Sequence, residues 1–167
     1  MFTPVRVVCN NTLTMALGQQ GERFRMPHVK AFDAEVVSAA EQALGLASEQ
    51  LESFEEQSKF LASKQYNDDK FDLFLAQLFQ PALITGDTVD RTQFNRTCEN
   101  VHELVYTQPG AKMSEGSWWS ALNAVTYYVD HKAGRNRDTS LQSAWFGPRA
   151  ATKRKALQLA TEMAEAA

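Results

Sequence analysis

The stretch SWWSALNAVTYYVDHKAGRNRDTSLQSAWFGPRAATKRK, residues 117–155, decides the fold that the sequence predicts. The Ser117 side chain can cap a helix, and apolar residues then recur at helical spacing at Trp118, Leu122, Val125 and Val129. Residues 132–139 (KAGRNRDT) have the composition of an exposed loop. Pro148 suits the first position of a last helix, whose apolar stripe is Ala156, Leu159, Ala160 and Met163. The stretch therefore predicts two amphipathic helices joined by a polar segment.

Two further helices are predicted immediately upstream of this stretch. Asn67 can cap the first, Pro81 ends it, and its apolar stripe is Phe71, Phe74, Leu75, Leu78 and Phe79. After an irregular link through Gly86, a second helix is expected around residues 92–106, with one side formed by Phe94, Cys98, Val101 and Val105. Gln108-Pro109-Gly110 then predicts a turn.

A long helix is predicted from Asp33 onward, because its apolar residues alternate in steps of three and four. This heptad seam consists of Val37, Ala40, Leu44, Ala47, Leu51, Phe54 and Leu61. Its outer face is acidic, with Glu41, Glu49, Glu52, Glu55 and Glu56. The seam can pack within the chain or form a coiled-coil dimer. Its alanines and Gly45 favour close packing within the chain.

The N-terminal segment predicts a small β element. Residues 4–9 are mostly β-branched and predict a strand, and residues 21–29 predict a second extended stretch. Between them, residues 10–12 can cap a brief helix that continues to about Leu17 and ends at Gly18. We therefore expect one domain, residues 1–167, of mainly α class. It is a bundle of about five to six helices that can include a small N-terminal β element.

Composition excludes several classes of protein. With 167 residues, of which 44% are hydrophobic and 10% aromatic, the chain can build a core and is not disordered throughout. No run of eighteen apolar residues is present, which predicts no membrane span, and the N-terminus does not have the pattern of a signal peptide. Cys9 and Cys98 lie far apart, which favours reduced thiols in the cytoplasm over a disulfide framework.

Charge is distributed unevenly along the chain. Residues 1–130 hold ten basic and seventeen acidic side chains, whereas residues 131–167 hold seven basic and three acidic ones. A basic C-terminal region on an acidic body indicates a surface for a partner, or two halves that complement each other within one fold.

Two blocks, TPVRVVCNNTLTMAL (residues 3–17) and SWWSALNAVTYYVDHKAGRNRDTSLQSAWFGPRAATKRKAL (residues 117–157), together resemble the C-terminal half of the phage/plasmid-like protein family, a domain of unknown function. The resemblance runs from Thr3 to about Ala160 and is most specific at Arg6 to Leu13, Trp119, Asn123, Tyr128 and Asp130. It implies a mobile genetic element and the cytoplasm of a bacterial host cell. Typical members carry a preceding half, apparently β-rich, so we expect a naturally short member or an excised part.

The first candidate site is a nucleic-acid or anion site at the start of the last helix, where unpaired N–H groups attract negative charge. Basic residues with a neighbouring aromatic suit phosphates and stacked bases. The residues expected here are Arg135, Arg137, Trp145, Arg149, Lys153, Arg154 and Lys155. The alternative is that carboxylates of the same chain, such as those of residues 49–56, pair with these cations.

The second candidate site is a partner surface on the helix that begins at residue 118. Its members are spaced by four residues and are Trp119, Asn123, Tyr127 and His131. The favoured alternative is an ordinary amphipathic helix, whose aromatic residues are half buried with their polar tips in water.

Enzymatic chemistry has little support in the sequence. The three histidines, His28, His102 and His131, have no metal-binding spacing, and no phosphate loop, dinucleotide motif or nucleophile elbow is present. Cys9 precedes a helix-capping segment, where a thiolate can be stabilised, but a buried structural cysteine is the favoured interpretation. We expect no catalytic residues, no cofactor, no metal, no membrane association and no small-molecule substrate.

Two functions from different classes remain. The first is an accessory module of a phage or plasmid that associates with nucleic acid in recombination or replication. The second is a protein-interaction module, such as a self-assembling accessory or homo-oligomer, or a counter-defence inhibitor that presents its acidic helix to a host protein.

Overall fold

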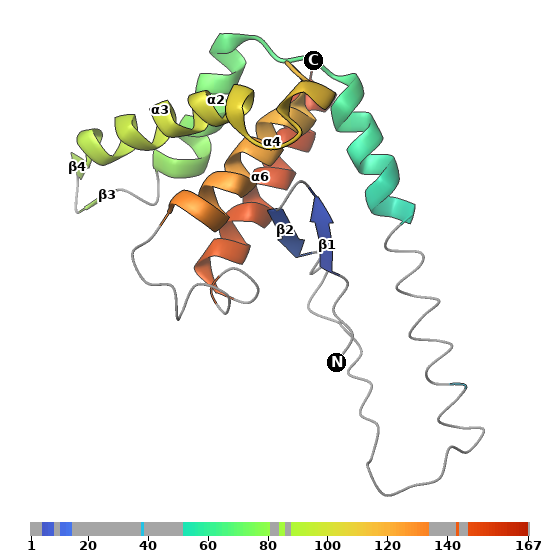
Figure 1. Cartoon of the computed structure of the whole chain (residues 1–167). Helices are drawn as coiled ribbons and strands as arrows, with labels where there is room; N and C mark the ends of the chain where they lie inside the picture. The colour runs from blue at the N-terminus through green and yellow to red at the C-terminus, as the bar shows by residue number, and fades with distance from the viewer. Residues whose placement is uncertain are drawn as a thin grey trace, which may run out of the picture.

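The computed structural model describes residues 5–8, 11–14, 38, 52–80, 84–85, 88–133, 143 and 147–166, and these residues form a mainly α fold, as the sequence predicts (Figure 1). Its helical elements are residues 52–63, α2 (Asp68–Phe79), α3 (Arg91–Thr107), the 3-10 helix η2 (Ala111–Met113), α4 (Trp118–Tyr127), the π-helical turn η3 (Tyr128–Lys132) and α6 (Pro148–Glu165).

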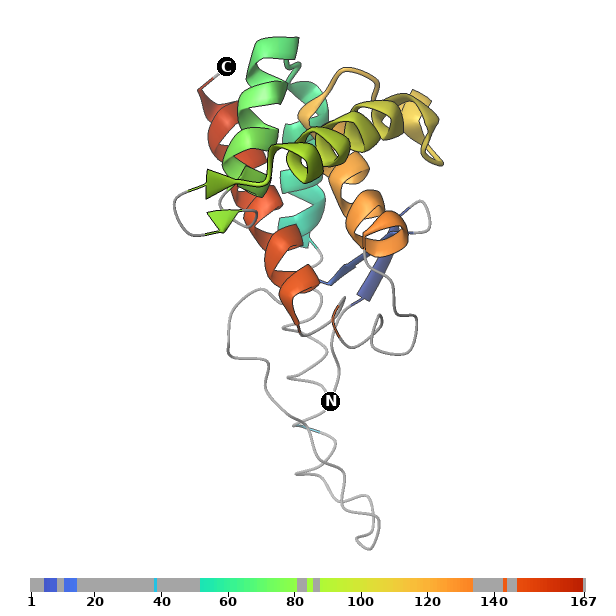
Figure 2. The same ribbon diagram turned by 90° about the vertical axis from the view of Figure 1, so that its left-hand side faces the viewer.

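Helix α4 forms the centre of the fold. It packs against α3, α6 and strand β2 (Asn11–Thr14), and α6 in turn packs against α2 (Figures 1 and 2). Seven of its ten residues are buried, including the small Ala121 and Ala124, which allow the neighbouring helices to approach closely. Trp118 is fully buried, with its ring 5.6 Å from that of Phe74 and 5.5 Å from that of Tyr66. The largest side chain of α4 thus joins it to α2 and to the segment before α2.

The predicted helix starts are confirmed by capping hydrogen bonds. The side chain of Asn67 accepts from the Lys70 amide at 2.9 Å, and that of Ser117 accepts from the Ser120 amide at 3.3 Å. Pro148 is the first residue of α6. The predicted stripe of α2 is buried at every position: Phe71, Phe74, Leu75, Leu78 and Phe79.

A pair of backbone hydrogen bonds ties the end of the helix of residues 52–63 to the start of α4. The Trp118 amide donates to the Lys64 carbonyl at 2.9 Å, and the Tyr66 amide donates to the Gly116 carbonyl at 3.1 Å. Gly116 has a φ of 75°, and a Cβ there would lie 2.7 Å from Gln65 Oε1. Glycine therefore relieves both the left-handed backbone and the close approach at this position.

The part of the heptad seam that the structure describes packs within the chain. Phe54 and Leu61 are buried, and Gln57 Nε2 donates to Thr161 Oγ1 at 3.0 Å. Apart from Ser38, which is helical, residues 33–51 lie outside the described part of the chain. Residues 52–63 are therefore a helix of the bundle, as the intramolecular alternative predicts.

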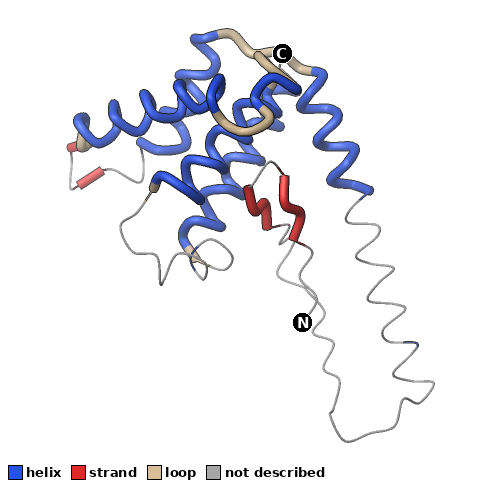
Figure 3. Tube along the Cα trace, in the orientation of Figure 1, coloured by secondary structure: helices blue, strands red, loops and turns tan. Residues whose placement is uncertain are grey.

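At the N-terminus, strands β1 (Val5–Val8) and β2 pair antiparallel, with Val5 opposite Thr14 and Val8 opposite Asn11 (Figure 3). The predicted strand is confirmed at residues 5–8. The expected helix of residues 10–17 is wrong at residues 11–14. Its β-branched threonines fit an extended strand paired with the valines of β1, and this pairing outweighs the capping tendency of asparagine. The extended stretch expected at residues 21–29 lies outside the described residues.

Two other expectations were wrong in detail. The link around Gly86 contains strands β3 (Ile84–Thr85) and β4 (Thr88–Val89), which pair antiparallel. Their β-branched residues flank a two-residue Gly-Asp connection, which is a recognised hairpin pattern. Lys132, expected in a loop, belongs to η3, because the helical chain of α4 continues as a π-helical turn.

We predict that α2 tolerates substitutions on one side only. Phe74→Ala should lower the free energy of unfolding by about 3–5 kcal/mol, because it removes a fully buried ring from the core. Leu73→Ala on the same helix should change it by less than about 0.5 kcal/mol, because Leu73 is 52% exposed. Urea denaturation of the two variants measures the difference. Equal losses would contradict this assignment of the two faces.

Candidate functional site

The structure places four of the seven residues of the predicted nucleic-acid or anion site, all on the first half of α6. Arg154 and Lys155 are exposed, and Lys155 Nζ donates to the Gln77 carbonyl at 2.9 Å. Arg149 is half-buried and its guanidinium donates to the Ala133 carbonyl. The other three, Arg135, Arg137 and Trp145, lie outside the described residues.

Lys153 is not on the surface. Its side chain is only 2% exposed, and its ammonium donates to Asp130 Oδ1 at 2.9 Å, with the Asp130 side chain 6% exposed. A buried ammonium that is paired with a buried carboxylate is not available to an external phosphate. Lys153 is therefore paired within the chain, as the alternative predicts. Its partner is Asp130 rather than a carboxylate of residues 49–56.

The π-helical turn η3 brings two acceptors to α6. The Ala133 amide donates to the Tyr128 carbonyl at 2.8 Å, which closes the widened turn. Asp130 then meets Lys153, and the Ala133 carbonyl meets Arg149. Two cations of α6 thus hold η3 in place.

Charge along α6 is distributed in the same sense as the helix dipole, which is the reverse of the stabilising arrangement. The basic residues occupy its first half, no acidic residue lies in its first turn, and Glu162 and Glu165 lie near its C-terminal end. Exposed cations near a helix N-terminus each cost roughly 0.3–1 kcal/mol. Arg154 and Lys155 are the seventh and eighth residues of α6 and lie beyond the first turn, where this cost has fallen off.

The predicted partner surface divides into two parts. Trp119 is half-buried, with its ring 5.9 Å from that of Phe54, and Asn123 Nδ2 donates to the Trp119 carbonyl at 2.9 Å. One turn further along, the rings of Tyr127 and His131 lie 4.5 Å apart. The first pair lines one pocket, and the second pair is not part of the lining of that pocket.

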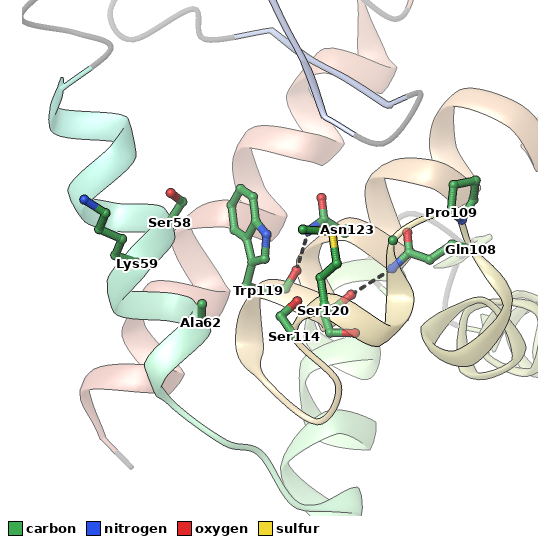
Figure 4. A pocket seen from close by; sticks show the side chains of 11 residues that line it. Ser58, Lys59, Ala62, Gln108, Pro109, Ser114, Trp119, Ser120 and Asn123 are labelled. Carbon is green, nitrogen blue, oxygen red and sulfur yellow. Dashed lines mark hydrogen bonds between the residues drawn. The ribbon is translucent and has the colours of Figure 1, made fainter.

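This pocket, which we call the Trp119 pocket, has a volume of about 300 Å³. Trp119 stands between the helix of residues 52–63 on one side and Asn123 and Gln108 on the other (Figure 4). Its lining combines hydroxyl and amide groups with apolar side chains and holds no carboxylate. The lining residues are Ser58, Lys59, Ala62, Gln108, Pro109, Gly110, Met113, Ser114, Trp119, Ser120 and Asn123.

Two buried polar atoms of the pocket lining have no hydrogen-bond partner among the described residues. Gln108 donates through Nε2 to the Ser120 carbonyl at 3.3 Å, which leaves its Oε1 unpaired, and Ser120 Oγ is unpaired too. Each such atom costs about 1–3 kcal/mol when it is buried without a partner. Trp118 Nε1, outside the pocket lining, is the third such atom in the described part. Of the three such atoms among the described residues, two therefore belong to the lining of this pocket.

Sequence reasoning identified Trp119 and Asn123 but missed Gln108 and Ser120. Gln108 was assigned only to a turn, and there its extended backbone ends α3 while its side chain reaches back to α4. Ser120 lies one residue past Trp119 and reads as an ordinary polar helix position. No spacing in the sequence links the two.

The remaining reactive groups that the structure describes offer little chemistry. Burial raises the pKa of the Cys98 thiol to about 11, so that the thiol stays protonated at neutral pH. Cys9 lies outside the described residues. Within the described ranges, no three His, Cys, Asp or Glu side chains gather as a metal site would require. No helix in the same ranges has the length and apolar character needed to cross a membrane.

Comparison with known proteins gives one family. The model of the family described as "Domain of unknown function (DUF932)" matches residues 1–158, nearly the whole chain. The comparisons with curated proteins and with solved structures gave no match. The resemblance to a domain of unknown function is therefore confirmed, whereas mobile-element origin and the correspondence to a C-terminal half stay predictions.

We predict strong coupling between Asp130 and Lys153. Asp130→Ala should lower the free energy of unfolding by about 3–5 kcal/mol, because it leaves a buried ammonium without its carboxylate. The double variant Asp130→Ala plus Lys153→Met removes both charges and should recover most of that loss. A double-mutant cycle by urea denaturation measures the coupling, and strictly additive losses would contradict it.

Proposed function

The chain belongs to the DUF932 family, a domain of unknown function, and we propose that it is a non-enzymatic accessory module of a phage or plasmid that associates with nucleic acid. One observation carries the proposal: exposed basic residues stand on the first half of α6 with no acidic residue in its first turn. The mobile-element context is supported by the resemblance of residues 3–17 and 117–157, and recombination and replication are the processes it suggests.

Arg154 and Lys155 are the residues proposed to contact phosphates. Both are exposed, on the second and third turns of α6. A phosphate placed here would gain from the charge of the two side chains. Lys153 takes no part in this contact, and Arg149 serves to hold the Ala133 carbonyl beside it.

The segment that precedes α6 extends the proposed contact. It contributes Arg135, Arg137 and Trp145, which add two cations and one ring that can stack on a base. A chain of net charge −3 would then meet nucleic acid through a local basic region, whose cations release counterions on binding.

We predict that Arg154→Glu weakens binding to single-stranded DNA and lowers the slope of log K against log salt concentration by about 1, because one phosphate contact is lost. Lys112→Glu is the matched control, since it reverses one exposed cation on η2, outside α6. Fluorescence anisotropy at several salt concentrations measures both. Undetectable binding at low salt, or equal effects of the two variants, would overturn the proposal.

A second candidate function is self-association through apolar side chains at the end of α3 and on η2. Tyr106 is 64% exposed and Met113 is 86% exposed, which is unusual for large apolar residues so near each other in sequence. Aromatic and methionine side chains are enriched at protein interfaces. This observation favours a protein-interaction module, with a second copy of the chain as the simplest partner.

If the chain forms a dimer through this region, Tyr106→Ser plus Met113→Ser should dissociate it, whereas Leu73→Ser, on exposed α2 surface, should not. Sedimentation velocity over a range of protein concentrations distinguishes the two variants. A chain that remains monomeric at every concentration removes this second function.

A further inference from the structure

We infer that the Trp119 pocket binds one uncharged, planar heterocycle that carries an N–H donor, of which a nucleobase is the biological example. The inference rests on the proposed function only for the source of that base, which is either a free nucleoside or a single strand of nucleic acid. The rest of the inference depends only on the residues that line the pocket.

The unpaired oxygen of Gln108 sets the hydrogen-bonding requirement. Because the Gln108 Nε2 donates to the Ser120 carbonyl, the amide is oriented with Oε1 as an unsatisfied acceptor. A ligand that pairs with this oxygen must present a donor such as an N–H group. Every nucleobase has one, and bases outside a duplex are recognised by hydrogen bonds of this kind.

The walls of the pocket set the shape and size of the ligand. Trp119 faces the amide side of the pocket (Figure 4), and Pro109 and Met113 add apolar surface. An indole wall favours a planar ring, because bases stack on aromatic side chains. A volume of about 300 Å³ stands at the small end of ligand pockets and suits one base rather than two.

The pocket lining includes an exposed, adaptable side chain. Met113 is 86% exposed, and its unbranched side chain can adjust to the surface of a bound ring. Lys59 also lines the pocket, but its ammonium pairs with Glu55 at 2.7 Å and points away from Trp119 (Figure 4), so it is not assigned to the ligand.

The test is titration of the whole chain with thymidine, followed by NMR of the Gln108 side-chain amide and the Trp119 indole N–H. We expect both resonances to shift. Thymidine whose ring N–H is replaced by N–CH₃ keeps the stacking surface but loses the donor. It should bind about threefold to tenfold more weakly, the effect of one hydrogen bond.

Gln108→Met should lose this discrimination between the two nucleosides, whereas Gln77→Met, at an exposed position on α2, should retain it. Comparison of the two nucleosides within each variant keeps the result independent of small changes in stability. Absence of shifts at Gln108 and Trp119, or equal affinity for both nucleosides in the unaltered chain, would overturn the inference.

A single-stranded oligonucleotide in place of thymidine distinguishes the source of the base. If the strand supplies it, the oligonucleotide shifts the same two resonances and Arg154→Glu weakens its binding without changing that of thymidine. If thymidine binds and the oligonucleotide does not, the pocket serves a free nucleoside and the proposed function fails while the inference stands. Because thymidine carries no phosphate, its binding tests the pocket alone. Binding of the oligonucleotide also tests the proposed phosphate contacts at α6.

Discussion

The burial of α4 is the constraint on which the rest of the structure depends. Trp118 has no exposed surface, and the small residues Ala121 and Ala124 let α3 and α6 pack closely on either side of it. The less buried residues of α4 are Trp119, Asn123 and Tyr127, which lie on one side of the helix. Asp130 lies in the π-helical turn that follows α4.

The two ends of this helical segment have different consequences. Near its start, the packing of Gln108 on Ser120 leaves acceptor capacity buried beside an indole. Past its end, η3 turns a carboxylate toward Lys153 and withdraws that lysine from the basic surface.

Periodicity and capping residues were sufficient to predict the helical core. The stripe of α2, the caps at Asn67 and Ser117 and the Pro148 start each depend on local spacing or local backbone chemistry, which a sequence displays directly. The strand at residues 11–14 was missed because its pairing with β1 outweighs the preference of asparagine for caps. The burial of Lys153 and the role of Gln108 depend on contacts between residues 23 and 12 positions apart, respectively, and no local pattern encodes such pairs.

We propose that nucleic acid contacts this fold both at α6 and at the Trp119 pocket. The most direct test is photo-crosslinking of the chain to a single-stranded oligonucleotide that carries iododeoxyuridine, with the crosslinked residues mapped by mass spectrometry. We expect a crosslink at Trp119 that Gln108→Met diminishes and high salt abolishes. Crosslinks confined to the helix of residues 52–63, or none at low salt, would contradict it.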